Sequence, residues 1–430
     1  MKKLVSLLLS VLLILGAFSG CGEAGGETTA PSTESPVPHS LSVGFGRADI
    51  TPKNTVPLAG GASDRVSKGI NEPIYTNCVA FTDETGNTFL LIISDLLYIG
   101  IPVSQARADI AKKTGIPATQ IWVGATHNHS GPAITLSDSL GIEEYSPYLR
   151  EQIVKAAEAA LADRKPAKMF TSEIYPKNLN FVRHYLMKDG SYAGDNFGDQ
   201  SFSNCVAHAA EVDNQMQLIK FTREGGKDIV LMNWQGHPTG HSEDAHRYKI
   251  MSCVTVATHK IEEELDCHLA YVLGASGNVN SSTRIKEERI TSDYVELYNL
   301  VAQHAIDAAA NFKAVETGKI QFLNEPCACN FKQGSATMNI SLSAFAIGDV
   351  AFVAAPYEMF CENGRSVKEK SPYETTFVST VTNGYASYIP SAPTYEYGGY
   401  EVNGTDLAQG SGERLADHFV SMLNKLHETK

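Results

Sequence analysis

Short apolar runs rich in β-branched residues constrain the fold of this chain more than any other feature. Each run is followed at once by a polar or glycine-containing loop. Because the runs are apolar throughout, they fit strands that are covered on both faces of a sheet. Ligands of open α/β sheets bind just beyond the carboxyl ends of the strands, so the loops form one candidate site if these ends converge. The runs and their loops end at Asp95, His129, His237, Asn280, Glu358 and Tyr388.

Helices are predicted where apolar residues recur along one side of a segment. In one of them, Leu149, Ile153, Ala157 and Leu161 are spaced four residues apart. The predicted helices cover residues 103–114, 148–163, 254–266, 293–312 and 413–427. No second linker or internal repeat interrupts the sequence after residue 41. The fold class is therefore predicted as α/β, with mixed, largely buried sheets flanked by helices in a single large domain over residues 41–430.

The N-terminus carries an export signal. Lys2 and Lys3 precede an apolar segment over residues 4–17, which is shorter than the roughly 20 residues of a membrane span. This pattern predicts a signal peptide over residues 1–20. The ending Phe-Ser-Gly-Cys resembles a bacterial lipobox, which predicts lipidation of Cys21 and anchoring to the outer face of a bacterial membrane; plain secretion is the alternative. Residues 21–40 are rich in Gly, Thr, Ser and Pro and predict a flexible tether.

Charge and cysteine content exclude some classes of protein. The formal net charge is −13 and the Lys and Arg residues are scattered, which argues against nucleic acid as a partner. The cysteines other than Cys21 do not form a disulfide framework and are expected to be mostly buried small apolar residues. One bridge, such as Cys327–Cys361, remains possible in an oxidising compartment.

Two histidines lie in the segment Thr-His-Asn-His-Ser-Gly-Pro over residues 126–132. Residues two apart on an extended chain point the same way, so His127 and His129 can face one cavity. One of them would then be a metal ligand, since neutral imidazole is the commonest ligand side chain, and the other would act on substrate. The same spacing also fits two surface histidines at the end of a strand.

Further candidates follow the other apolar runs. His237 lies between a glycine and a proline after a buried run, so its loop is tightly defined. Glu358 also follows an apolar run, and a carboxylate is costly to bury without a partner. Either a metal ion or Arg365 would explain Glu358. Tyr388 by itself is interpreted as an aromatic residue at an interface, and Asp95 either orients a histidine or caps the next helix.

The order of short motifs resembles that of the neutral/alkaline, non-lysosomal ceramidases. The segment "GATHNHSGP" is similar to the family signature Thr-His-Thr-His-Ser-Gly-Pro. The resemblance extends from about Val43 to Glu401, and the joint order of the motifs makes it specific. The other matching segments are "VGFGRADITP", "NWQGHPT", "YVLGASGNVNSS", "APYEMFCENGRSV" and "NGYASYIPSAPTYEYGGYE".

The resemblance implies a zinc hydrolase that cleaves an amide bond in a ceramide-like or other N-acyl substrate, either a small molecule or a lipid. One catalytic Zn²⁺ per chain would activate water. His129 would be the catalytic residue that carries the proton, and Arg183 would bind substrate. Tyr385 is a second candidate for the tyrosine ligand. The metal ligands carried over from the family are His127, His237, Glu358 and Tyr388.

The sequence departs from the family pattern at two points. The family serine falls on Asn280, which favours attack by metal-activated water and gives Asn280 a catalytic role as a hydrogen-bond donor to the substrate carbonyl. Family members also carry an immunoglobulin-like domain, for which the sequence after Glu401 shows no counterpart. Both departures favour an alternative, an amidase or esterase acting on a cell-wall or glycan-derived substrate. A non-catalytic extracytoplasmic binding lipoprotein is the third interpretation.

Overall fold

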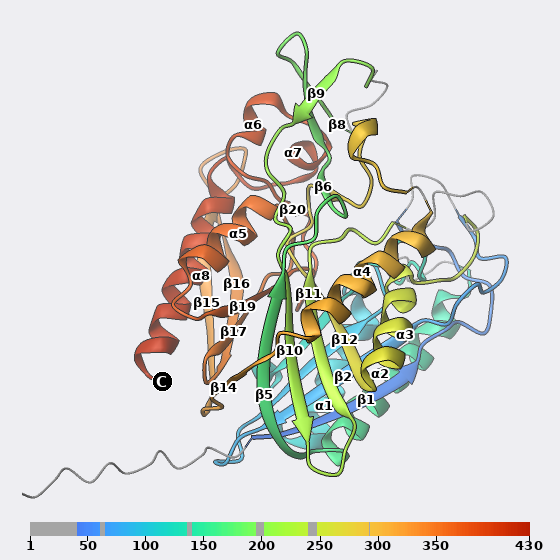
Figure 1. Cartoon of the computed structure of the whole chain (residues 1–430), viewed down its shortest axis with the longest axis vertical. Helices are drawn as coiled ribbons and strands as arrows, with labels where there is room; N and C mark the ends of the chain where they lie inside the picture. The colour runs from blue at the N-terminus through green and yellow to red at the C-terminus, as the bar shows by residue number, and fades with distance from the viewer. Residues whose placement is uncertain (1–40, 61–64, 136–139, 195–201, 240–246, 292) are drawn as a thin grey trace, which may run out of the picture. The chain divides into compact units, whose positions relative to one another are not determined.

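The computed structural model describes residues 41–60, 65–135, 140–194, 202–239, 247–291 and 293–430, which belong to one compact unit (Figure 1). The predicted signal peptide, the tether over residues 21–40 and the predicted lipidation site Cys21 lie outside these residues. Within the described part of the chain, every helix is too short or too polar to cross a bilayer.

The larger of the two main sheets has nine strands in the order β12-β11-β10-β5-β1-β2-β3-β4, with β14 also paired to β5. The pairs β3–β4 and β11–β12 are parallel and the pairs between them are antiparallel, so the sheet is mixed as predicted. The apolar runs before Asp95, His129, His237 and Asn280 form β3, β4, β11 and β12. The strands are β1 Leu41–Asp49, β2 Tyr75–Thr82, β3 Thr88–Ser94, β4 Ile121–Ala125, β5 Lys165–Ile174, β10 Met216–Arg223, β11 Asp228–Trp234, β12 Cys267–Leu273 and β14 Lys313–Val315.

The second main sheet has four strands in the order β15-β16-β17-β19, and the last two are parallel. Its strands are β15 Ile320–Asn330, β16 Thr337–Ile347, β17 Val350–Ala354 and β19 Thr375–Ser379. Three further short sheets pair β13 with β6, β18 with β20, and β7 with both β8 and β9. Their strands are β6 Phe181–Val182, β7 His184–Met187, β8 Tyr192–Gly194, β9 Cys205–His208, β13 Val279–Asn280, β18 Glu358–Met359 and β20 Tyr388–Ile389.

The two main sheets pack face to face through an apolar layer with an aromatic centre. Phe89 of β3 stacks on Phe345 of β16 with ring centroids 3.9 Å apart, and Phe81 of β2 lies 5.9 Å from the same ring. Trp122 of β4 contacts Phe345 edge-on. Such aromatic pairs stabilise by about 0.5–1.5 kcal/mol beyond the area that they bury. The aromatic layer therefore fixes how the sheets lie on each other.

Helices cover the outer face of each sheet. Helices α1 to α4 pack on the nine-stranded sheet, and α5 and α8 pack on the four-stranded sheet (Figure 1). Both sheets are therefore buried on both faces, which explains why their central strands are apolar at nearly every position. The helices are α1 Ile101–Thr114, α2 Ile142–Ala162, α3 Cys253–Leu265, α4 Tyr294–Ala309, α5 Cys361–Lys370, α6 Thr394–Tyr397, α7 Tyr400–Gly404 and α8 Ser411–Glu428, with 3-10 turns η1 Ala118–Gln120 and η2 Lys286–Glu288.

The predicted helices are all present, and the largest shift is at the start of α2. This helix begins at Ile142 rather than at residue 148, although Pro147 lies inside it. Proline removes one backbone hydrogen bond from a helix. Burial of Ile142 and a hydrogen bond from Tyr145 Oη to Ile50 O (2.5 Å) offset this loss. Packing against β1 thus decides where the helix begins.

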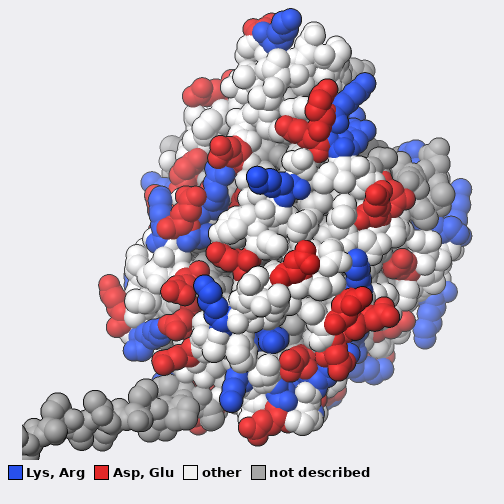
Figure 2. Space-filling model, in the orientation of Figure 1, with Lys and Arg blue, Asp and Glu red and all other residues white. Residues whose placement is uncertain are grey.

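The seven described cysteines are all free, and six of them are buried. Cys327 and Cys361 do not form the bridge that the sequence left open. The alternative prediction, that most cysteines are buried as small apolar residues, is confirmed. On the face of the molecule shown in Figure 2, acidic and basic side chains are interspersed, as the scattered charges of the sequence suggested.

Helix α2 lies so close to β1 that its contact requires glycine. A Cβ atom on Gly44 would lie 2.1 Å from Ala160 O, and one on Gly46 would lie 2.1 Å from Ala156 O. We expect Gly46→Ala to lower the free energy of unfolding by about 1–3 kcal/mol, because the helix must move away from the strand. Urea unfolding would measure the change, with Ser42→Ala on the same strand as the control. Equal stability of the two variants would contradict this account of the contact.

Candidate metal centre

Three histidines from two distant segments of the chain converge at the carboxyl ends of β4 and β11. One nitrogen from each of His127, His129 and His237 lies within 4.8 Å of the others. Strands β4 and β12 are at opposite edges of the nine-stranded sheet, yet they approach each other. The curvature of the sheet therefore brings together loops that the strand order alone would place far apart.

Backbone carbonyls fix the orientation of all three imidazole rings. His127 Nδ1 donates to Leu97 O (3.0 Å), His129 Nδ1 to Gly60 O (2.8 Å) and His237 Nδ1 to Ser276 O (3.2 Å). A carbonyl oxygen can only accept, so Nδ1 carries the proton in each ring and Nε2 is the potential ligand atom. This arrangement is typical of metal-binding histidines, whose second nitrogen is usually held by a carbonyl or carboxylate.

The contact between His129 and His237 requires a positive charge. Their Nε2 atoms are 2.8 Å apart, and in two neutral rings both atoms would present lone pairs. Burial, followed by the neighbouring His127 and His129, lowers the pKa of His237 well below its usual value. A proton on His129 Nε2 makes the contact a hydrogen bond. A cation among the three rings removes the same repulsion.

Glu358 completes the cluster. Its side chain is 2% exposed, and its Oε2 lies 3.2 Å from His127 Nε2 but accepts no hydrogen bond from any described residue. Its Oε1 accepts a hydrogen bond from Tyr385 Oη (3.1 Å). A buried carboxylate oxygen without a donor is costly, and a cation would compensate for it. Arg365 does not have this role, because it contacts Glu211 O (3.2 Å) and Glu369 (3.9 Å).

Both candidate tyrosines lie beside Glu358. Tyr385 stacks on Tyr98 with ring centroids 3.7 Å apart. Tyr388 is paired with Glu358 in the parallel β18–β20 ladder and is buried. Burial and the charge of Glu358 raise the pKa of both phenols. Tyr385 holds one carboxylate oxygen, and Tyr388 approaches the carboxylate from the adjacent strand.

The backbone around the cluster is strained. His127 (φ 63°), Val381 (φ 49°), Asn383 (φ 65°) and Ser387 (φ 78°) adopt left-handed conformations, which are especially unfavourable for β-branched valine. Hydrogen bonds hold this segment against β4, from Ala125 N to Val381 O (3.2 Å) and from Asn383 N to Val123 O (2.7 Å). Such strain costs about 1–3 kcal/mol per residue and clusters at functional sites.

Arg183 and Asn280 are neighbours through the β6–β13 pairing. Asn280 is paired with Phe181, and Arg183 N donates to Asn278 O (2.9 Å). The Arg183 side chain is 5% exposed and is bound by Glu401, with Nε 2.7 Å from Glu401 Oε1. Glu401 ends the last motif of the resemblance, but no sequence pattern linked it to Arg183.

Asp95 takes neither of its two expected roles. Its Oδ1 accepts hydrogen bonds from Thr126 Oγ1 (3.1 Å) and Ser252 Oγ (3.3 Å), and its Oδ2 accepts from Tyr75 N (3.0 Å). Helix α1 begins later, with Gly100 as its N-cap. Asp95 therefore anchors the loop that precedes His127. The carbonyl of Leu97, which the sequence could not single out, orients the ring.

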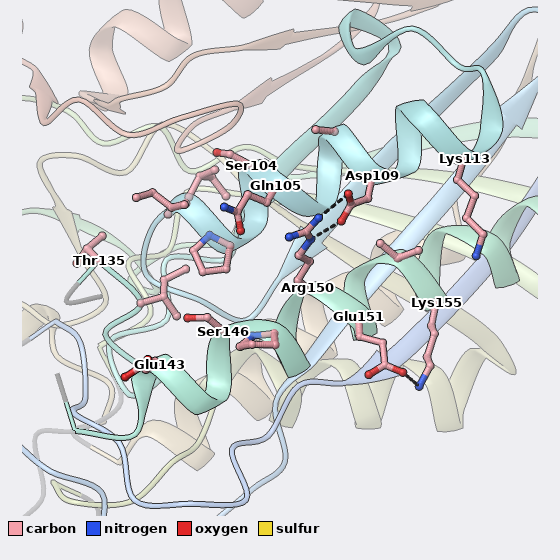
Figure 3. Close-up of a pocket in the computed structure, with 18 of the residues that line it drawn as sticks. Ser104, Gln105, Asp109, Lys113, Thr135, Glu143, Ser146, Arg150, Glu151 and Lys155 are labelled. Atoms are coloured by element: carbon pink, nitrogen blue, oxygen red, sulfur yellow. Dashed lines mark hydrogen bonds and ion pairs between the residues drawn. The ribbon is translucent and has the colours of Figure 1, made fainter. Parts of the chain in front are cut away.

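A groove of about 1240 Å³ lies between α1 and α2 (Figure 3). None of the three histidines lines it. Its charged residues pair with one another, as in the contact of Arg150 with Asp109 and that of Lys155 with Glu151 (2.8 Å). The groove therefore lacks the converging nitrogen and oxygen atoms of the histidine cluster.

The sequence matches no protein-family model and no curated protein. Solved structures similar in fold include two ceramidases. A ceramidase complexed with C2 superposes with a TM-score of 0.71 and 15% sequence identity, over 91% of this chain and 76% of that one. The neutral ceramidase from Pseudomonas aeruginosa superposes with a TM-score of 0.71 and 16% identity, over 92% of this chain and 75% of that one. The chain therefore has the fold of the neutral ceramidases.

Proposed function

We propose that this protein is a zinc-dependent hydrolase that cleaves the amide bond of a ceramide-like or other N-acyl substrate. The observation that carries the proposal is the cluster of three imidazoles, two buried and one half-buried, beside a buried carboxylate oxygen that accepts no hydrogen bond from a described residue. Imidazole and carboxylate donors suit zinc, which accepts both at about 2.0–2.2 Å. The fold likeness to ceramidases supports an amide as the bond that is cleaved.

His127, His237 and Glu358 would hold the zinc ion. The hydrogen bond from Tyr385 to Glu358 Oε1 keeps Oε2 directed at His127, which favours Tyr388 as the fourth ligand. Bound zinc supplies Lewis-acid polarisation of a carbonyl group and lowers the pKa of water to about 7. The carbonyls of Leu97 and Ser276 hold the rings of His127 and His237 in the protonation state that binding requires.

His129 would move the proton. Its Nδ1 hydrogen is held by Gly60 O, so Nε2 accepts a proton from the attacking water and later donates it to the leaving amine nitrogen. The C–O bond forms first as the carbonyl double bond opens; the C–N bond then breaks as the double bond re-forms and the nitrogen takes the proton, which releases a carboxylate and an amine. Asn280 and Arg183 would donate hydrogen bonds to the carbonyl oxygen as it gains negative charge.

The sequence pattern of residues 1–21 supports a place outside the cytoplasmic membrane. We propose that the protein is exported and held at the outer face of a bacterial membrane by a lipid on Cys21.

The metal content and the reaction can be tested together. Purified protein is expected to contain about one zinc ion per chain, as a single closed set of donors implies. Elemental analysis would measure the zinc. Chelation should abolish hydrolysis, and added zinc should restore it, in assays with ceramide, other N-acyl amides and simple esters.

The outcomes separate the interpretations. Hydrolysis of esters or small N-acyl compounds without ceramide would favour the amidase or esterase alternative. Zinc binding without turnover of any substrate would favour a binding lipoprotein, and absence of zinc would contradict the proposal.

A further inference from the structure

A buried ionic cluster adjoins the histidines and includes Glu401, which is neither a proposed metal ligand nor a proposed catalytic residue. Glu401 of α7 is 1% exposed. Its Oε1 accepts from Arg183 Nε (2.7 Å) and contacts a terminal Arg183 nitrogen at 2.6 Å, while its Oε2 lies 3.1 Å from His184 Nε2. Tyr397 Oη lies 3.4 Å from His184 Nδ1.

The charges of Arg183 and Glu401 cancel. Burial alone would raise the pKa of Glu401, but Arg183 and then His184 outweigh burial and hold it at about 2, so Glu401 is ionised at neutral pH. Arg183 is always protonated. The guanidinium of Arg183 and the carboxylate of Glu401 therefore form a pair without net charge, as is expected of groups removed from water.

The cluster is connected to the proposed metal ligands through Gly277 and Tyr400. The terminal nitrogen of Arg183 also donates to Gly277 O (2.7 Å). Gly277 lies against Glu358 so closely that a Cβ atom on it would be 2.6 Å from Glu358 O. Helix α7 contacts β20, and the Tyr400 ring lies 5.7 Å from the ring of Tyr388. Two independent routes therefore join the ion pair to Glu358 and Tyr388.

We propose that Glu401 is a positioning and specificity-determining residue: it holds the Arg183 guanidinium in place and cancels its charge, so that the site accepts an uncharged polar group and discriminates against a carboxylate. This inference rests on the proposed function, in which Arg183 contacts the substrate. An unpaired Arg183 would bind a carboxylate through charge-assisted hydrogen bonds, which are about twice as strong as neutral ones. With Glu401 present, a carboxylate would compete with an anion already in place.

The test compares hexanamide with hexanoate, which differ in charge but not in chain length. Calorimetry would give both dissociation constants for wild type and for Glu401→Gln. The ratio of the two constants is expected to shift toward hexanoate by about tenfold or more, the effect of one added charge-assisted hydrogen bond. Any direct contact of hexanoate with the metal is common to both proteins and cancels from the comparison.

Two further variants test the direction in which the ratio of the two dissociation constants shifts. Arg183→Gln removes the cation that pairs with Glu401 and is expected to shift the ratio at least about tenfold away from hexanoate. The double variant Arg183→Gln/Glu401→Gln should return the ratio to the wild-type value. Asp163→Asn is the matched control, because Asp163 pairs with buried Arg223 at the other end of β10, and its ratio should not change.

An unchanged ratio in folded Glu401→Gln would overturn the proposal, as would failure of the folded wild type to bind either compound. If Glu401→Gln does not fold, an unchanged ratio in Arg183→Gln has the same meaning. Because calorimetry needs no turnover, this result is independent of the hydrolysis assays. Lack of hydrolysis would count against the proposed function alone.

Discussion

Replacing His127 with alanine is expected to remove both the bound zinc and the hydrolytic activity. His127 Nε2 lies 3.2 Å from Glu358 Oε2, and the ring is held by Leu97 O. The ring of His127 also lies 4.7 Å from that of His237, so His127 is placed between the carboxylate oxygen and the other imidazole ligand. Loss of a group that merely orients a ligand already costs roughly 10–100-fold in metal affinity, so loss of the ligand itself should exceed about 100-fold. Zinc analysis after dialysis and a hydrolysis assay would measure the two effects.

His259→Ala is the matched control for this experiment, because His259 is an exposed histidine on α3. It should retain zinc and turnover. A folded His127→Ala protein that keeps its zinc would remove His127 from the metal site and with it the centre of the proposed mechanism.

Replacing His129 with alanine should have a different effect. The protein is expected to keep its zinc, while kcat falls by about 10²–10⁴-fold, the usual contribution of a general acid–base group. Its Nε2 is 2.8 Å from His237 Nε2, so the position of this nitrogen fits either a proton carrier or a third histidine ligand. Parallel measurement of zinc and kcat separates these roles.

Loss of zinc from His129→Ala would make His129 a ligand, and another group would then have to carry the proton. Full retention of both zinc and turnover would exclude His129 from either role. His259→Ala again serves as the control.

The sequence predicted the layers of the fold well, because apolar periodicity reports burial directly. The apolar runs became β3, β4, β11, β12, β17 and β19, and the one-sided stripes became helices. The start of α2 was missed because tertiary contacts at Ile142 and Tyr145 outweigh the local effect of Pro147. The long hairpin of β15 and β16 was also missed, since partly exposed positions interrupt its apolar pattern.

The candidate site was predicted in its residue types but not in its contacts. His127 and His129 share a local motif, so a short segment identified them. The pairing of Arg183 with Glu401 spans 218 positions, and no local pattern encodes such a contact. The carbonyls of Leu97, Gly60 and Ser276 are equally invisible in the sequence, because every residue has a carbonyl and only the fold decides where it points.

The stacked rings of Phe89 and Phe345 have a consequence for the histidine cluster, although they do not touch it. His127 and His237 extend from one sheet, whereas Glu358 and Tyr388 follow strands of the other. A slide of one sheet over the other would therefore separate nitrogen donors from oxygen donors while leaving each side chain intact. The aromatic layer opposes that slide. Mutations between the two sheets can therefore abolish metal binding without contacting the histidine cluster.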